Sequence, residues 1–575
     1  MNAALSRNEG EGEPIRADAQ TTFRSLIEGD RLLTAEELSI VEESDDATQL
    51  ADHIARGRRT CVQVTKVHLK LAALLQQACG PYSEIFFDAA LKRAEELDRR
   101  SEKAGRLFGV PISIKAHISM EGTGSDRGFV FDVLRPEAKR RLVDELEKQG
   151  QVEESIISLL RKQAEHLGSS NAPMVDKLLS EGAIIIAKTR MPQSVVQLDT
   201  RSNLHGQTLN PLNMNLSPGG SSGGEAASVS AGATFLGLGT DIGGSVRQPA
   251  SCCGLYGIRP SVGRIAVAGI NSTMPGNEGI IGTAGPFAKS RRDLELMMAI
   301  LASGSHNVDP FLCPPIPWQN TEDVELPKRK LRVGVMYHDG HVEPITPIRR
   351  TLAHVVEQLK ADGRVEIIPF DAEDAGVVAW KLARELYCFM ESGQLIKSLA
   401  NLTNEPLVPL TRYICETSPV KNHSAAESWE LQYARETFKR QFWKRFGSSS
   451  SSSSPFGPDA KIDVLLCPAG AQVAPRPGKI WYWGYTSLFN LTDLPGVVFP
   501  AKNFVADSKA DLQYEGREKG RTQSNEALDK QNKEEYERNR EVFDGAPVGL
   551  QLIGHRFKEE TLLKSLELIE HAMKH

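Results

Sequence analysis

The residues best suited to chemistry gather in residues 217–260, SPGGSSGGEAASVSAGATFLGLGTDIGGSVRQPASCCGLYGIRP. Glycines and serines alternate there with a short apolar run that is typical of a buried strand. Glycine at this density indicates backbone conformations that other residues avoid, or a close approach of the backbone to another group. A flexible linker would not be interleaved with a strand. The segment is therefore predicted to form a functional site.

Two common kinds of glycine-rich site fit this segment poorly. A phosphate-binding loop needs Gly-Lys-Ser/Thr after its glycines, or G-x-G-x-x-G opening a helix, and neither occurs here. Residues 220–224, GSSGG, do satisfy the G-x-S-x-G pattern of a nucleophile elbow, with Ser222 as its serine. That elbow follows directly on a strand, whereas the preceding TLNPLNMNLSPG is rich in Asn and Pro, as loops are. We therefore expect this match to be accidental.

A third interpretation joins both serine clusters to an earlier lysine in one site. A serine hydroxyl is a poor nucleophile until a base removes its proton, and a lysine can be that base if burial lowers its pKa. Lys115 ends the mainly apolar run GVPISIK, which should hold its side chain in the interior. A lone lysine at a strand end would instead be expected to reach solvent. None of the thirteen histidines, His117 and His205 included, has a recognisable triad context.

The elements that must position these residues are short apolar runs flanked by glycine. Residues 108–118, 181–191 and 233–241 read FGVPISIKAHI, EGAIIIAKTRM and ATFLGLGTD, and each is typical of a buried strand. Helical spacing of apolar residues precedes them, and the C-terminal stretch predicts a strand, a turn and an amphipathic helix. The expected architecture is a sheet covered on both faces.

The domain prediction is a disordered tail over residues 1–20 and one catalytic domain over residues 21–575. A charged segment with helical spacing at about residues 133–167 separates the lysine run from the serine clusters, so it is predicted to be a helical insertion. The serine run at 448–454 and the polar stretch at 507–540 are predicted to be low-complexity or charged loops.

Charge and cysteine content narrow the possible partners. With 68 basic and 74 acidic residues, net −6, the chain gives no reason to expect nucleic acid or an anionic membrane surface, so a small-molecule substrate is expected. The eight cysteines form no C-x-x-C pair, and no run of eighteen apolar residues occurs. The first twenty residues are polar and lack the apolar core of a signal peptide. These features favour a cytoplasmic protein with reduced thiols and no transmembrane segment.

Residues 217–260 closely resemble the amidase signature, in which GGSSGG is followed by G-T-D-x-G-G-S-x-R and then by C-G-x-x-G-x-x-P. The resemblance extends from LTAEEL at residue 33 to GAPVGLQLIG at residue 545 and so covers most of the chain. It implies the amidase fold: an α/β protein with a central mixed, twisted β-sheet wrapped by helices. It also implies that no metal or other cofactor is required.

The resemblance assigns a role to individual positions. It implies that Ser245 forms the acyl-enzyme, that Ser221, preceded by a cis peptide bond, relays the proton, and that Lys115 accepts it. The backbone amides of the loop that ends at Ser245 would form an oxyanion hole, because glycines leave the carbonyl unobstructed. Val195, in PQSVVQ, corresponds to an acyl-pocket position. The amide-bearing residues are Ile242, Gly243, Gly244 and Ser245, and the residues expected to play supporting roles are Lys188, Ser222, Asp241 and Arg247.

The implied reaction is hydrolysis of a carboxamide to a carboxylic acid and ammonia or an amine. Within the family the chain looks most like fungal acetamidases and general amidases. The alternatives are an enzyme resembling fatty acid amide hydrolase, a glutaminase subunit of a tRNA-dependent amidotransferase, and a non-catalytic scaffold derived from an amidase. Each of these alternatives is compatible with a homodimer.

Overall fold

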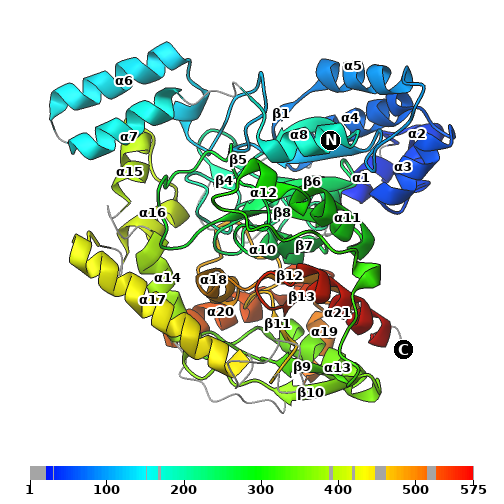
Figure 1. Cartoon of the computed structure of the whole chain (residues 1–575), viewed down its shortest axis with the longest axis vertical. Helices are drawn as coiled ribbons and strands as arrows, with labels where there is room; N and C mark the ends of the chain where they lie inside the picture. The colour runs from blue at the N-terminus through cyan, green and yellow to red at the C-terminus, as the bar shows by residue number, and fades with distance from the viewer. Residues whose placement is uncertain are drawn as a thin grey trace.

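A single large sheet runs through the length of the protein (Figure 1). The computed structural model describes residues 21–29, 31–150, 152–165, 170–387, 393–417, 421–446, 461–514 and 526–573. The predicted tail at 1–20 and the serine run at 448–454 lie outside these residues. From edge to edge the strands are β1 (Tyr82–Ile85), β3 (Ile184–Thr189), β2 (Pro111–Lys115), β6 (Leu236–Asp241), β8 (Thr283–Ala288), β7 (Tyr256–Arg259), β12 (Gly496–Val505), β13 (Pro547–Ile553), β11 (Val464–Pro468), β9 (Leu331–Val335) and β10 (Val365–Pro369).

The sheet is mixed. β3, β2 and β6 pair in parallel at one end, and β11, β9 and β10 pair in parallel at the other. The strands between them pair antiparallel, as does the edge strand β1. The prediction of a mixed α/β sheet is thereby confirmed. A separate two-stranded ribbon joins β4 (Arg201–Ser202) to β5 (Gly206–Gln207).

The strands that carry the predicted site are buried on both faces. Every residue of β2, β3 and β6 is buried, which explains why PISIK, IIIAKT and LGLGTD do not alternate between apolar and polar residues. Helices cover both faces, as expected (Figure 1). The three runs predicted to be strands from their sequences are strands.

The N-terminal helical layer packs at the β1 end of the sheet (Figure 1). It consists of α1 (Phe23–Gly29), α2 (Ala35–Glu42), α3 (Ala47–Ala55), α4 (Cys61–Ala78) and α5 (Phe87–Asp98). The remaining helices outside the predicted insertion are α8 (Pro173–Ser180), α9 (Gly223–Ser230), α10 (Arg247–Cys252), α11 (Arg291–Ala302), α12 (Ser305–Val308), α13 (Thr346–Ala361), α14 (Ala375–Tyr387), α15 (Gln394–Asn401), α16 (Pro409–Glu416), α17 (Ala425–Phe446), α18 (Gly484–Thr492), α19 (Ser508–Gln513), α20 (Glu526–Arg538) and α21 (Glu559–Ala572). Short 3-10 turns are η1 (Val130–Val133), η2 (Thr321–Asp323) and η3 (Arg540–Phe543).

The segment predicted to be a helical insertion contains α6 (Pro136–Gln149) and α7 (Glu154–Glu165), which project from one corner of the molecule (Figure 1). α6 ends at Gly150, whose left-handed backbone suits glycine. The buried face of α7 belongs to the same apolar cluster as residues of α15.

The prediction of charged loops over residues 507–540 is wrong for the described part of that stretch, which contains α19 and α20. Asp507 caps α19 by accepting from the N–H groups of Lys509 and Ala510. α20 is held by Asn532, whose amide donates to the carbonyls of Glu343 and Ala471. The polar composition of this stretch suggested a loop, because it offers few apolar residues to bury. The hydrogen bonds from Asn532 that hold α20 run to backbone far away in the sequence, and the local sequence does not reveal those partners.

Candidate active site

The lysine run and the first serine cluster meet at the end of β2. Lys115 Nζ donates to Ser221 Oγ at 2.7 Å and to Thr240 Oγ1, on neighbouring β6, at 3.1 Å. Lys115 is 0 % and Ser221 1 % exposed, and the peptide bond from Gly220 to Ser221 is cis. Thr240 was missed by sequence reasoning, although it lies inside the G-T-D motif.

Burial sets the charge of this lysine. It lowers the pKa of Lys115 to about 7, although the carboxyl groups of Asp241 and Glu225 act in the opposite direction. An amine with this pKa is uncharged in a large fraction of molecules at neutral pH. Lys115 can therefore both accept a proton from Ser221 and return it.

Glu225, in the first turn of α9, is a buried carboxyl close to the lysine that sequence reasoning also missed. The hydroxyls of Ser113 and Thr189 donate to it at 2.7 and 2.6 Å. Burial raises the pKa of Glu225 to about 8, even though these hydrogen bonds and Lys115 lower it. A carboxyl that is mostly protonated at neutral pH does little to hold the proton on Lys115.

His117 reaches the lysine through Thr240. Its Nδ1 lies 3.0 Å from the carbonyl oxygen of Asn271, which can only accept, so Nδ1 carries the proton. Burial lowers the pKa of His117 well below its ordinary value, so the ring is neutral and Nε2 accepts from Thr240 Oγ1 at 3.0 Å. Thr240 thus keeps its lone pairs for Lys115.

The second serine cluster follows β6 and leads into α10. Ser245 is 3 % exposed, and its carbonyl accepts from the N–H of Ser222 at 3.2 Å, which ties the two clusters together. The hydroxyl of Ser222 donates to the carbonyl of Thr240 at 3.3 Å. Ser222 precedes α9 without a strand directly before it, because β5 ends at Gln207. The arrangement disfavours the nucleophile-elbow interpretation.

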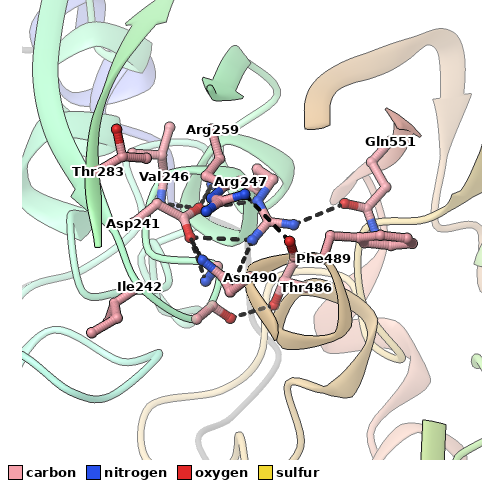
Figure 2. Close-up of polar contacts among 12 residues, drawn as sticks. Asp241, Ile242, Val246, Arg247, Arg259, Thr283, Thr486, Phe489, Asn490 and Gln551 are labelled. Carbon is pink, nitrogen blue, oxygen red and sulfur yellow. Dashed lines mark hydrogen bonds and ion pairs between the residues drawn. The ribbon is translucent and has the colours of Figure 1, made fainter. Parts of the chain in front are cut away.

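A buried ion pair holds the base of the Ser245 loop (Figure 2). Asp241 accepts from Arg247 Nε at 3.1 Å and from Asn490 Nδ2 at 2.9 Å, and neither partner of the ion pair is exposed. Burial alone would raise the pKa of Asp241, but Arg247 and the hydrogen bonds hold it well below its usual range. Asp241 therefore stays ionised and anchors Arg247 at the base of the loop.

The loop amides differ in their availability. The N–H of Gly244 donates to Asp241 Oδ1 at 2.8 Å, so the expectation that it serves the oxyanion hole is not met in this arrangement. Within the described part of the chain, the N–H groups of Ile242, Gly243 and Ser245 donate no hydrogen bond to the protein. Three amides of the expected four are therefore free to bind an oxyanion.

Val195 lies beside the lysine strand. It packs in a small apolar cluster with Ala116 and Met191, and its backbone is left-handed, with φ of 68°. A β-branched residue rarely adopts this conformation, which indicates a strained segment held by its surroundings. That Val195 lines an acyl pocket stays a prediction.

Lys188 is buried and bonds to backbone carbonyls. Its Nζ donates to the carbonyl of Gly124 at 2.7 Å and to that of Ala116 at 3.4 Å. No cluster of three or more potential metal ligands occurs among the described residues. The same residues contain no helix that is long and apolar enough to cross a membrane.

Known proteins are similar to this chain in architecture and in sequence. The amidase family model matches residues 63–153 and 161–563. An acetamidase of Aspergillus oryzae is 30% identical over 96% of this chain and 93% of its own length. An amidase of Gibberella moniliformis is 31% identical over 94% and 90%. The solved structure of a fatty acid amide hydrolase superposes with a TM-score of 0.80 at 31% identity, covering 100% of this chain and 93% of that one.

The mixed sheet with its covering helices and these matches define a hydrolase that acts on amide bonds. The chain belongs to the amidase family, whose model covers most of its length.

Proposed function

We propose that this enzyme hydrolyses a carboxamide through an acyl-Ser245 intermediate, with Ser221 as proton relay and Lys115 as the base. The contact that carries the proposal is the 2.7 Å hydrogen bond between Lys115 Nζ and Ser221 Oγ. A lysine whose pKa burial lowers to about 7 is a useful base at neutral pH. A protein serving only as a scaffold would gain nothing from burying such a group.

The proposed reaction has two steps. Ser245 Oγ attacks the amide carbon while its proton passes to Ser221 Oγ and the Ser221 proton passes to Lys115 Nζ. The carbonyl oxygen gains negative charge and is stabilised by the free loop amides. Lys115 then returns a proton through Ser221 to the leaving nitrogen, and the C–N bond breaks. Water attacks the ester by the same route and releases the acid and Ser245.

A small or medium-sized primary amide is the proposed substrate class, because similar proteins include an acetamidase. The fatty acid amide hydrolase structure supports a long-chain amide as the second candidate. The seven described cysteines are buried free thiols, which supports the proposed cytoplasmic location.

A fluorophosphonate probe followed by peptide mapping tests the nucleophile. We expect the label on Ser245, and S245A should lose the label and at least about a thousandfold of amide hydrolysis. S222A is the matched control and should still be labelled at Ser245. Label on Ser222 with Ser245 unmodified would overturn the assignment. Rates with acetamide, benzamide, indoleacetamide and a long-chain acyl amide would then identify the substrate class.

A further inference from the structure

Two hydroxyl groups from distant helices hold consecutive carbonyls of the loop before Ser245. Tyr387, the last residue of α14, donates through Oη to the carbonyl of Ile242 at 3.1 Å. Thr486, in α18, donates through Oγ1 to the carbonyl of Gly243 at 2.6 Å, a contact drawn in Figure 2. The direction of each peptide unit in this loop is therefore fixed from outside the loop.

A hydrogen bond to one carbonyl also fixes the direction of the next amide N–H. In a trans peptide the C=O and the following N–H point in opposite directions. Because Thr486 holds the carbonyl of Gly243, the N–H of Gly244 points the other way, and there it donates to Asp241 at 2.8 Å. Because Tyr387 holds the carbonyl of Ile242, the N–H of Gly243 points away from Tyr387, and it has no protein acceptor among the described residues.

The Tyr387 hydroxyl is fixed as a donor. Tyr387 is 1 % exposed, and burial raises the pKa of its hydroxyl, so the hydroxyl keeps its proton. That proton is donated to the carbonyl of Ile242. A Cβ built on Gly243 would lie 2.4 Å from Tyr387 Oη, so the hydroxyl occupies the space that any side chain at position 243 would need.

We propose that Tyr387 is a positioning residue for the oxyanion hole: its hydroxyl fixes the Ile242–Gly243 peptide so that the Gly243 N–H faces the acyl oxygen of the substrate. This inference rests on the proposed function. Thr486 has the complementary task and directs the Gly244 N–H to Asp241. Of two adjacent amides, one is presented to the substrate and the other anchors the loop.

Y387F tests the inference, because it removes the hydroxyl and keeps the ring. Removing an oxyanion donor outright costs about 10²–10³ in kcat, so loosening one that remains should cost about tenfold. We expect kcat to fall about tenfold with KM and the pH midpoint unchanged. A trifluoromethyl ketone, which forms an oxyanion on Ser245, should bind about tenfold more weakly. If Tyr387 had a purely structural role, Y387F would lower the stability of the protein without a specific loss of kcat or of inhibitor affinity.

Y485F is the matched control. The buried Tyr485 hydroxyl also donates to a backbone carbonyl, that of Val342 at 2.7 Å, but outside the Ser245 loop. Y485F should lower the melting temperature, while kcat and the inhibitor affinity stay within twofold of wild type. If Y387F does not fold, T486V removes the hydroxyl that holds the neighbouring Gly243 carbonyl and should weaken inhibitor binding in the same direction.

The two proposals fail in different ways. If wild-type protein hydrolyses amides and is labelled at Ser245, but Y387F keeps kcat and inhibitor affinity within twofold, the role of Tyr387 is overturned and the proposed function stands. If the wild type neither hydrolyses any amide of the panel nor is labelled at Ser245, both are overturned.

Discussion

A lysine can act as a base at neutral pH only where its surroundings favour the uncharged amine. Lys115 ends β2, and Lys188 is the next-to-last residue of the neighbouring parallel strand β3. Burial lowers the pKa of both, to about 7 and about 8. Their hydrogen-bond partners separate their roles. Lys188 donates to carbonyl oxygens, which carry no proton to exchange, whereas Lys115 donates to the Ser221 hydroxyl, which does. The contact with a hydroxyl, more than the lowered pKa, supports Lys115 as the proposed base.

The pH dependence of activity tests this distinction. A base must be deprotonated to act, so kcat/KM should rise as pH increases through about 7, the pKa to which burial lowers Lys115, and then level off. K115A should lower kcat/KM at least about a hundredfold. K188A is the control and should retain the midpoint near pH 7 even if it is less stable. Near-normal turnover of K115A at pH 7 would remove Lys115 from the mechanism.

At the scale of elements, the segment predicted to be an insertion contributes one helix face to an apolar cluster. The buried face of α7 belongs to the same apolar cluster as Val196 and Leu198, which follow the predicted acyl-pocket residue Val195. Gln163 of α7 also donates to the carbonyl of Ser272 at 3.1 Å. α7 is therefore held by α15 and by the loop that contains Ser272, which accounts for its helical spacing. Other members of the buried face of α7 are Ile156, Ile157, Leu160 and Ala164.

Truncating one of these side chains should measure how firmly α7 is anchored. Leu160 is 0 % exposed, so L160A should lower the free energy of unfolding by about 2–5 kcal/mol, through lost burial and a residual cavity. The exposed Ser158, on the opposite face, supplies the control S158A, which should change it by less than about 0.5 kcal/mol. Urea unfolding of the three proteins makes the comparison. Equal stability of L160A and S158A would mean that α7 is not anchored through Leu160.

At the scale of the whole molecule, burying ionisable groups at the end of the sheet lowers the stability of the folded state. Lys115, Glu225 and His117 are ionisable groups buried close together. Burial lowers the pKa of Lys115 and His117 and raises that of Glu225, so the neutral form of each group is favoured. For Lys115 the unfolded chain binds the proton more tightly than the folded one between about pH 7 and about pH 10.4. The resulting penalty is fully present below pH 7 and disappears as pH rises toward 10.4.

Lys115→Met should reveal this penalty. Methionine carries no charge, so the stability of the variant relative to wild type should decline by roughly 3 kcal/mol between pH 6.5 and pH 9.5. The absolute difference also contains the loss of the hydrogen bonds to Ser221 and Thr240, which does not follow this pH dependence. Urea unfolding at both pH values measures the change. If the stability of the variant relative to wild type were the same at both pH values, or higher at pH 9.5, the folded protein would not hold Lys115 uncharged.

The sequence alone was enough to identify three strands of the sheet, the helical character of residues 133–167 and the segments that carry Lys115, Ser221 and Ser245. This succeeded because backbone demands are local: buried parallel strands require unbroken apolar runs, and tight loops require glycine. The tertiary structure alone decided which loop amides are free and which distant groups orient them. Tyr387 and Thr486 lie 145 and 243 residues from their carbonyl partners. Such contacts depend on how remote helices pack, and nothing in the neighbouring residues records them.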